Sequence, residues 1–362
     1  MYPLVEIDLG KLRRNTEIVV HKCMEQNIDV AGVTKCFCGN PIIAREFLMG
    51  GVSYLADSRL ENLKKLRMLD VPKIMIRLPM ISEIEEVVKY ADISLNSELD
   101  TVKKIGQVAS SMDKVHGIVL MVDLGDLREG FFNKEDIISA CEEVNSISGV
   151  KLMGIGTNLS CYGGVVPTCE NLGRLTEIKE SIENRIGRSL DIVSGGNSSS
   201  YQLVEAGKMP CGVNNLRLGT MLLLGHDEVN DKWIKGTYHD CFILKTEIVE
   251  IKDKPSKPIG EIGKDAFGNV PAFEDEGIIK RAICAIGKQD TDIKWMEPLD
   301  RSIKILGASS DHLILDISKS KMDYHVGSIV EFQLDYVAIL SVMNSTYVRK
   351  VIKNRDEKVR EG

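Results

Sequence analysis

The sequence has no block of basic residues, no long apolar run and no cysteine spacing typical of a metal finger. Its 46 Lys and Arg residues are outnumbered by 53 Asp and Glu residues, which gives a formal net charge of −7. This balance argues against nucleic acid or an anionic membrane as the main partner. No apolar run reaches the length of a membrane span, and the first residues carry charge too early for a signal peptide. We therefore expect a cytoplasmic protein whose nine cysteines are reduced.

Eight short apolar runs alternate with helix-like stretches between residue 29 and about residue 225. The runs are Asp29–Thr34, Ser53–Ala56, Lys73–Leu78, Ile93–Leu95, His116–Asp123, Lys151–Thr157, Leu190–Ser194 and Asn215–Leu218. A strand-then-helix unit repeated eight times predicts an α/β fold, a (β/α)8 TIM-type barrel, with a doubly wound open sheet as the alternative. A further helix, Lys11–Glu25, is expected before the first strand.

The pattern changes after Gly225, where strand-like runs and Pro/Gly-rich turns replace the helices. The predicted strands are Phe242–Ile251, Ile278–Gly287, Ile303–Leu306, Leu313–Ile317, Ser328–Phe332 and Val337–Val342. A chain of 362 residues also exceeds the usual size of a single core. We predict a barrel domain over residues 1–226 and a C-terminal β-rich domain over residues 227–362.

Lys35 ends the apolar run that begins at Asp29, and the following Cys36-Phe-Cys-Gly-Asn-Pro41 cannot continue a strand. A strand that ends on an amine and turns into a helix places the amine at the mouth of an α/β fold, where ligands bind. A lysine held there can form a Schiff base with an aldehyde cofactor. Taken alone, Lys35 could equally be a surface lysine.

Polar residues also follow the fifth, sixth and seventh predicted strands. Arg128, just past the fifth, could hold a phenolate or carboxylate, or simply pair with Asp126 or Glu129. Asn158 ends the sixth and is placed to contact the edge of a planar ligand. After the seventh, Ser194-Gly-Gly-Asn-Ser-Ser-Ser200 offers hydroxyls and helix-start N–H groups to a phosphate, although such a segment is also a common turn.

The eighth predicted strand carries Asn215-Leu-Arg-Leu-Gly-Thr220. Gly219 and Thr220 can add backbone donors to the same phosphate, because barrels often bind phosphate after strands seven and eight. Arg217 is expected to point inward, and a buried arginine needs an acceptor such as a pyridine nitrogen. A lysine, a phosphate cup and this arginine together indicate pyridoxal 5'-phosphate. Because arginine keeps its proton, the ring nitrogen facing it stays unprotonated, which favours reprotonation at Cα and therefore racemisation.

These motifs resemble those of the alanine racemase family, the fold-type III pyridoxal enzymes, in which a (β/α)8 barrel precedes a β-domain. The matching segments are Val33-Thr-Lys35, Leu124-Gly-Asp-Leu-Arg128, Asn197-Ser198, Arg217-x-Gly219-Thr220 and Gly307-Ala-Ser-Ser-Asp311, and Tyr347 is similar to a phosphate-contacting tyrosine. The resemblance implies that Lys35 carries the cofactor, that Asn197 and Ser198 contact its phosphate, and that Arg217 meets its ring nitrogen. It also implies a homodimer, in which the β-domain of one subunit completes the partner's site.

Longer runs are similar to a branch of this family that acts on the diamino acid ornithine. They are Ala56–Lys65, Tyr90–Asp100, Met121–Gly130, Ser194–Ser200 and Leu306–Leu313. The resemblance implies racemisation of ornithine, with lysine, arginine or alanine as further amino acids that could react. Asp290, Asp292 or Glu274 would then hold the distal ammonium.

The sequence departs from the family pattern where the second catalytic base is expected. Family members carry a tyrosine in Gly-Tyr-x-Asp-Gly, and the matching stretch is Gly287-Lys-Gln-Asp-Thr-Asp292. Lys288 takes the position of the tyrosine, so Lys288 or Asp290 is predicted to serve as this base. Cys161 and His312 are the alternatives.

Two other functions share this fold or this cofactor. A lyase of the D-threonine aldolase or D-serine dehydratase type would use a metal beside the cofactor, for which His239, Cys241 and His312 are available. The Gly307–Asp311 segment favours the racemases, so no metal is expected. A non-catalytic pyridoxal carrier is disfavoured because such proteins lack a second domain.

Overall fold

The computed structural model describes residues 1–227, 229–265, 267–268 and 270–353. The chain divides into two units. One unit is Gly10–Tyr238, and the other combines Met1–Leu9 with the chain from His239 onward.

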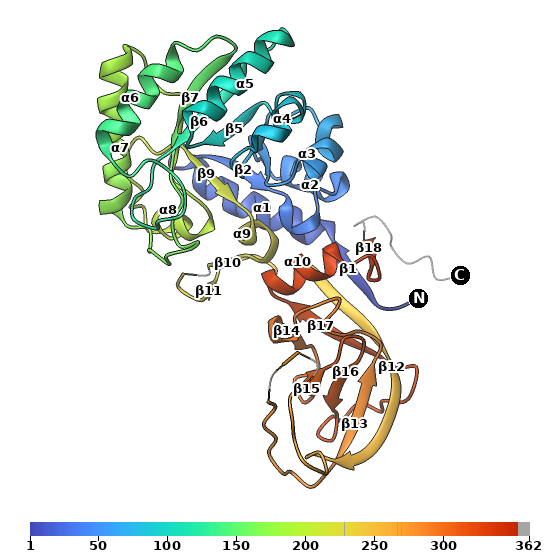
Figure 1. The fold of residues 1–362 in the computed structure, drawn as a ribbon. Coiled ribbons are helices and arrows are strands. Elements are labelled where there is room, and N and C mark those ends of the chain that lie inside the picture. Colours follow the sequence, from blue (N-terminus) through green and yellow to red (C-terminus); the bar gives the residue numbers. More distant parts are fainter. Residues whose placement is uncertain (228, 266, 269, 354–362) are drawn as a thin grey trace. The chain divides into compact units, whose positions relative to one another are not determined.

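A closed barrel of parallel strands forms the first unit (Figure 1). Its strands are β2 (Asp29–Val33), β3 (Tyr54–Asp57), β4 (Lys73–Met75), β5 (Ile93–Asn96), β6 (His116–Met121), β7 (Val150–Gly156), β8 (Ile192–Ser194) and β9 (Asn215–Leu218). Each overlaps the apolar run that predicts it, and β2 pairs with β9 to close the ring. The predicted (β/α)8 barrel is confirmed.

Helices lie between the strands, and one precedes them. They are α1 (Leu9–Met24), α2 (Pro41–Met49), α3 (Leu60–Lys65), α4 (Ile84–Tyr90), α5 (Leu99–Ser111), α6 (Lys134–Asn145), α7 (Cys169–Ile186), α8 (Tyr201–Glu205) and α9 (Thr220–Leu224). Local signals set several of their ends. The Asn40 side chain caps α2 and Pro41 occupies its first turn, while Thr168 and Asn171 cap each other at the start of α7.

Apolar side chains fill the barrel and also cover its outside. The inner cluster includes Ala31, Val33, Ala56, Ile74, Leu95, Val119, Met121 and Ile192. A second cluster joins outward-facing strand residues to buried residues of α5, α6 and α7. Because both faces of the strands are buried, the strand runs are apolar throughout rather than alternating. Polar groups are thereby concentrated at the strand ends, which positions the candidate site.

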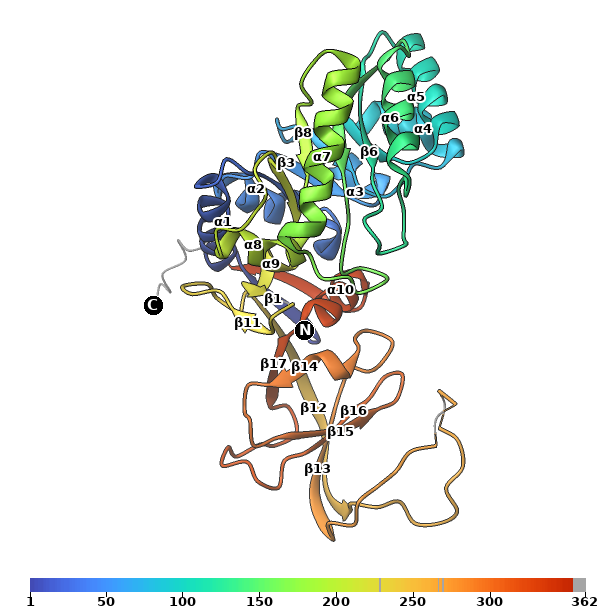
Figure 2. The same ribbon diagram turned by 90° about the vertical axis from the view of Figure 1, so that its left-hand side faces the viewer.

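The second unit is built on an antiparallel sheet with one parallel pair (Figure 2). Its strands are β1 (Leu4–Asp8), β12 (Phe242–Pro255), β13 (Ile278–Cys284), β14 (Met296–Pro298), β15 (Lys304–Ala308), β16 (Leu313–Asp316), β17 (Ile329–Leu334) and β18 (Arg349–Lys353). The long strand β12 pairs with β1 and β17 along its first half and with β13 along its second half. The predicted β-rich C-terminal domain is confirmed.

The strand predicted over Val337–Val342 is wrong, because this segment lies in helix α10 (Tyr336–Asn344). A short apolar run has no periodicity that separates a strand from a buried helix. Asp335 supplies the missing signal, since its side chain accepts a hydrogen bond from the Tyr336 N–H and caps the helix.

The unit boundaries also differ from the predicted division at residues 226 and 227. Strand β10 (His226–Asp227) pairs with β11 (Lys232–Trp233) inside the barrel unit, and Asn15 of α1 exchanges two hydrogen bonds with the backbone of Tyr238. At the other end of the chain, Met1–Leu9 belongs to the β unit because β1 pairs with β12 and β18. These partners are too distant in sequence for a local pattern to reveal.

Among the described residues, no helix has both the length and the apolar character needed to cross a membrane.

Gly154 in β7 offers a direct test of the barrel packing. A Cβ at this position would lie 1.7 Å from the carbonyl oxygen of Ile192 in β8. Gly154→Ala must therefore displace backbone, and we expect it to lower the free energy of unfolding by about 3 kcal/mol or more.

The matched control is Gly173→Ala in α7, where an added Cβ meets nothing within 4 Å. This change is expected to stabilise the protein by up to about 1 kcal/mol. Urea unfolding of both variants checks the pair, and equal stabilities would contradict the packing described here.

Candidate active site

The predicted site residues of the barrel unit gather at one end of the barrel. They follow or end successive strands: Lys35 after β2, Arg128 after β6, Asn158 after β7, Asn197 and Ser198 after β8, and Arg217, Gly219 and Thr220 at the end of β9. Since the carboxyl ends of all barrel strands face the same side, these residues share one mouth.

Lys35 opens a tight turn directly after β2. A 3-10 turn covers Lys35–Phe37, Cys38 adopts a left-handed conformation, and Phe37 is fully buried. Gly39 follows with φ +59°, and a Cβ there would lie 2.7 to 2.9 Å from atoms of Asn62. The turn therefore fixes the backbone conformation at Lys35, while the Lys35 side chain is exposed to solvent. Among the described residues, no side chain or backbone group forms an ion pair or hydrogen bond with the Lys35 ammonium.

A buried carboxyl group ties this turn to β3. Thr34 Oγ1 donates to Asp57 Oδ2 at 2.5 Å, while Asn62 Nδ2 and the Arg59 N–H donate to Asp57 Oδ1 at 3.1 and 2.9 Å. Burial raises the pKa of Asp57 even though these donors oppose the shift. Sequence reasoning did not select Asp57 as a site residue, although it lies in the Ala56–Lys65 run that carried the family resemblance. Asp57 positions Lys35 through its neighbour Thr34.

Arg217 points into the barrel and is 5% exposed. Its Nη1 donates to Ser194 Oγ at 2.5 Å, and its Nη2 donates to the Thr157 carbonyl at 2.8 Å. No carboxylate forms an ion pair with it among the residues that the structure describes. Burial lowers the pKa of Arg217 to about 10, which still leaves it charged at neutral pH. A buried cation held only by neutral oxygens is suited to a ligand that presents an unprotonated acceptor.

The Asn158 amide lies between two guanidinium groups. In one orientation its oxygen accepts from Asn197 Nδ2 at 3.2 Å and from Arg217 Nη2 at 3.4 Å. Rotated by half a turn, it accepts from the two terminal nitrogens of Arg128 at 3.2 and 3.3 Å. The Asn158 oxygen can therefore accept from Arg217 or, after rotation of the amide, from Arg128, but not from both at once.

Arg128 is partly exposed and forms an ion pair with Glu129, one of the two partners considered above. This ion pair raises the pKa of Arg128. The guanidinium also contacts the Cys161 thiol. The other possible partner, Asp126, instead holds the loop that carries Cys161.

Asp126 is buried, and its carboxylate accepts from the backbone of that loop. Tyr162 N–H and Val165 N–H donate to it at 2.9 and 3.1 Å. Burial opposes its ionisation, but these donors and the N–H groups of Cys161 and Gly163 outweigh burial, so the pKa of Asp126 lies below its ordinary value. The loop flanking Arg128 is therefore held by one ionised side chain.

The segment after β8 forms a cup of hydroxyl and N–H groups. Asn197 caps the 3-10 turn Ser198–Ser200 through a 2.8 Å hydrogen bond from the Ser199 N–H. Ser198 Oγ accepts from the Gly219 N–H at 3.3 Å, which joins this turn to the start of α9 at Thr220. Two segments separated in sequence thus meet at one place, where the Ser198 hydroxyl lies beside the start of α9.

The remaining predicted residues lie in the β unit. Lys288 Nζ lies 3.9 Å from the centre of the Phe267 ring. Asp290 is buried, and its Oδ1 accepts from Ser345 Oγ at 2.6 Å. Ser345 Oγ also accepts from the Tyr347 N–H at 3.1 Å, while the Tyr347 side chain is 67% exposed. Ser345, which the sequence analysis missed, therefore links two predicted site residues.

The turn that carries Lys288 is paired to the Gly307–Asp311 segment. The Lys288 N–H donates to the Ser309 carbonyl at 2.9 Å, and a Cβ on Gly287 would lie 2.2 Å from the Ser310 carbonyl oxygen.

Two of the acids predicted to hold the distal ammonium of the substrate differ in their surroundings. The Asp292 side chain accepts from the Lys294 N–H and caps a 3-10 turn, while Glu274 is exposed. Within the described ranges, no three His, Cys, Asp or Glu side chains are grouped to hold a metal ion.

A family model described as "Alanine racemase, N-terminal domain" matches residues 7–227. Ornithine racemase of Acetoanaerobium sticklandii is 49% identical to this chain over 350 residues, which cover 97% of this chain and 99% of that protein. Lysine racemase of Thermotoga maritima is 38% identical over 353 residues, with 97% and 98% covered.

Two kinds of solved structure share the fold. Alanine racemase of Clostridium difficile superposes with a TM-score of 0.75 at 21% identity, covering 99% of this chain and 97% of that one. D-threonine aldolase of Filomicrobium marinum gives a TM-score of 0.71 at 12% identity, covering 95% and 89%. At these identities the likeness extends to the fold alone.

Asp126→Asn is expected to lower the free energy of unfolding at neutral pH. It is also expected to make the melting temperature depend less on pH in the acid range. A carboxyl group whose folded-state pKa is below its unfolded value of about 3.9 stabilises the fold fully above that value. Its contribution is lost as the pH falls through the lower, folded-state pKa. Melting temperatures measured from neutral pH to about pH 2 should therefore fall less steeply in Asp126→Asn than in the wild type.

Asp70→Asn is the control, because Asp70 is exposed and holds no loop. If the curves of wild type and Asp126→Asn run parallel, Asp126 does not hold the 161–165 loop in its ionised form.

Proposed function

Since this chain belongs to the alanine racemase family, we propose that it interconverts L- and D-ornithine by removing and returning the proton on Cα. The observation that carries the proposal is the match to a protein named ornithine racemase along almost the full length of both chains. Lysine is the second candidate substrate, because the relative named lysine racemase also matches along nearly the whole chain. Both are diamino acids, so the two assignments share a requirement for a site that receives a distal ammonium.

The residues at the barrel mouth fit pyridoxal 5'-phosphate. Lys35 offers an exposed amine without a partner in the described chain, and Arg217 offers a buried cation without a carboxylate. Ser198 and Gly219 bring donors together for a phosphate. When bound, this cofactor supplies an aldehyde that attaches to amines and a ring that withdraws electrons from Cα.

We assign Lys35 to both carrying the cofactor and moving the Cα proton on one face of the substrate. The rigid turn around it limits where the amine can reach, because Thr34 is tied to Asp57 and Phe37 is buried. Arg217 keeps its proton and would serve as a donor to the ring nitrogen of the cofactor, which would moderate electron withdrawal and favour return of the proton to Cα. Arg128 and Asn158 would contact the ring substituents, and Asn197, Ser198, Gly219, Thr220 and Tyr347 would hold the phosphate.

Inversion at Cα needs a second proton carrier on the opposite face, and we propose Lys288 for this role. Asp290 is less suited because it is buried and engaged by Ser345. Its carboxylate instead holds the turn that presents Lys288. The ammonium of Lys288 lies over the Phe267 ring, with Nζ 3.9 Å from the ring centre.

We also propose a homodimer, in which the β unit of one copy serves the barrel mouth of the other, and a cytoplasmic location. All nine cysteines are thiols rather than disulfides in the structure, which agrees with a reducing compartment.

Cα deuterium uptake in D2O tests the proposed reaction. L-ornithine incubated with the wild type should gain deuterium and yield D-ornithine, as followed by NMR and chiral chromatography. In Lys35→Ala, the rates of deuterium uptake and of D-ornithine formation should both fall by at least about a hundredfold, because general base catalysis typically contributes that much or more. Lys104→Ala, which changes an exposed lysine on α5, should behave as the wild type.

Uptake with lysine but not with ornithine would move the substrate assignment to lysine. Absence of uptake with either amino acid, in protein that has bound the cofactor, would overturn the racemase proposal.

Lys288→Gln separates the two faces of the reaction. With Lys35 intact, the variant should still exchange the Cα proton of one enantiomer with retention of configuration. Its racemisation should fall by about a hundredfold or more, because the proton can no longer be delivered to the other face.

Cys161→Ala serves as the comparison, since Cys161 is the exposed thiol beside Arg128. If Cys161→Ala rather than Lys288→Gln shows one-sided exchange, the thiol is the second carrier and the assignment of Lys288 is wrong.

A further inference from the structure

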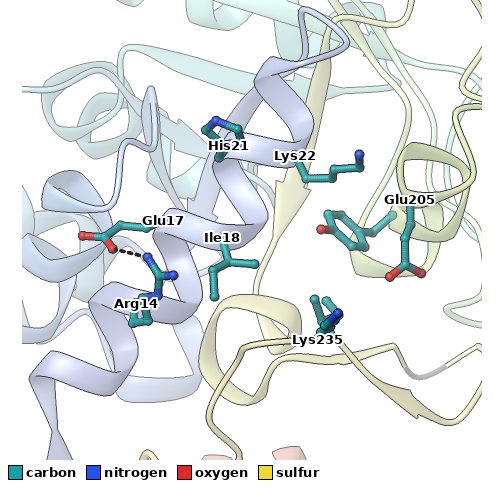
Figure 3. Close-up of a pocket in the computed structure, with 9 residues that line it drawn as sticks. Arg14, Glu17, Ile18, His21, Lys22, Glu205 and Lys235 are labelled. Atoms are coloured by element: carbon teal, nitrogen blue, oxygen red, sulfur yellow. Dashed lines mark hydrogen bonds and ion pairs between the residues drawn. The ribbon is translucent and has the colours of Figure 1, made fainter.

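A cavity of about 440 Å³ lies on the outside of the barrel unit, away from the residues assigned above (Figure 3). It lies between α1, α8 and the segment at Ile234–Lys235. Its volume is within the usual range for small-molecule sites, toward the lower end. None of its lining residues takes part in the proposed reaction.

The cavity lining combines three residues with apolar surface, one of which carries a hydroxyl group, with six charged or titratable residues. Ile18, Ile234 and Tyr201 line it, and Ile234 and Tyr201 are 5% and 2% exposed. Within the described chain, the Tyr201 hydroxyl has no hydrogen-bond partner. Burial raises the pKa of Tyr201, so the hydroxyl stays protonated and acts as a donor. The hydroxyl faces the cavity, so it can donate a hydrogen bond to a molecule held there.

The rim of the cavity carries more cations than available anions. Of its two carboxylates, Glu17 pairs with Arg14 at 3.4 Å and Glu205 pairs with Lys232 at 2.6 Å. Figure 3 shows Glu17 turned toward Arg14, while Glu205 lies on the same side of the view as Lys235. Lys235 is exposed and has no ion-pair partner among the described residues. An incoming anion would therefore meet a free ammonium, whereas an incoming cation would have to displace an existing ion pair.

From these features we propose that the cavity binds a small organic anion, with an apolar or aromatic body against Ile18 and Ile234 and its charge at Lys235. The Tyr201 hydroxyl donates to the same molecule. The site is close to the phosphate cup along the chain, since the Tyr201 N–H donates to the Ser198 carbonyl. It is nevertheless a separate cavity, and its ligand need not be the substrate of the reaction.

The test uses 8-anilinonaphthalene-1-sulfonate, which combines an aromatic body with one negative charge and fluoresces when it enters an apolar site. The protein is loaded with pyridoxal phosphate and freed of unbound cofactor, so that the phosphate cup is filled. We expect saturable binding that weakens at least fivefold in Tyr201→Phe and in Lys235→Met. Tyr201→Phe removes only the hydroxyl, and Lys235→Met removes the charge but keeps most of the stem.

Lys208→Met is the matched control, because it removes an exposed lysine shortly after α8 and outside the cavity lining. It should leave binding unchanged. Unsaturable fluorescence, an equal loss in Lys208→Met, or unchanged binding in Lys235→Met would each overturn the proposal. Lys235 is exposed, so its variant keeps the test valid even if Tyr201→Phe fails to fold. Because the readout is binding rather than turnover, failure of the racemase proposal would not affect it.

Discussion

A buried guanidinium without a carboxylate partner is the constraint on which the barrel mouth depends. Arg217 is held by Ser194 and the Thr157 carbonyl, so the ends of β7, β8 and β9 must stay in register to satisfy it. Space beside it is limited at Gly156, where an added Cβ would lie 3.1 Å from the Cβ of Ser194, the residue that accepts from Arg217. A neighbouring carboxylate would stabilise this charge but would also remove the site's attraction for a ligand acceptor. Among the described residues, the fold thus keeps Arg217 without a directly paired carboxylate, although Glu129 acts on its charge electrostatically.

Most of the barrel could be predicted because its strands are buried on both faces and read as uniform apolar runs. Every barrel strand overlaps its predicted run, and the helix predicted over Lys11–Glu25 overlaps α1 at Leu9–Met24. The failures have two different physical causes. The partners that make β1 a strand, β12 and β18, are remote in sequence. For α10 the signal is local, since Asp335 caps the helix, but a short apolar run has no periodicity that separates a helix from a strand.

The site residues that follow barrel strands could be predicted, because the carboxyl ends of all strands in a barrel face the same side. This geometry brings Lys35, Arg128, Asn158 and Arg217 to one edge, as their positions after the strands implied. The side chains that hold them were not predictable, because buried carboxyls and hydroxyls have no sequence pattern of their own. Asp57 and Ser345 became visible only through their hydrogen bonds, and Asp126 proved to hold a loop rather than pair with Arg128.

The first and last described strands of the chain run side by side, with β1 and β18 paired in parallel. The barrel is therefore an insertion within the β unit, and the sheet is discontinuous in sequence. On the ribosome, β1 emerges before the barrel, while β12 and β18 emerge only after the whole barrel has been made. All barrel strands are synthesised before β12 and β18, so the barrel can close while β1 is still unpaired. The β unit must then assemble last, so a chain that stops early leaves β1 as an unpaired edge that quality-control factors can recognise.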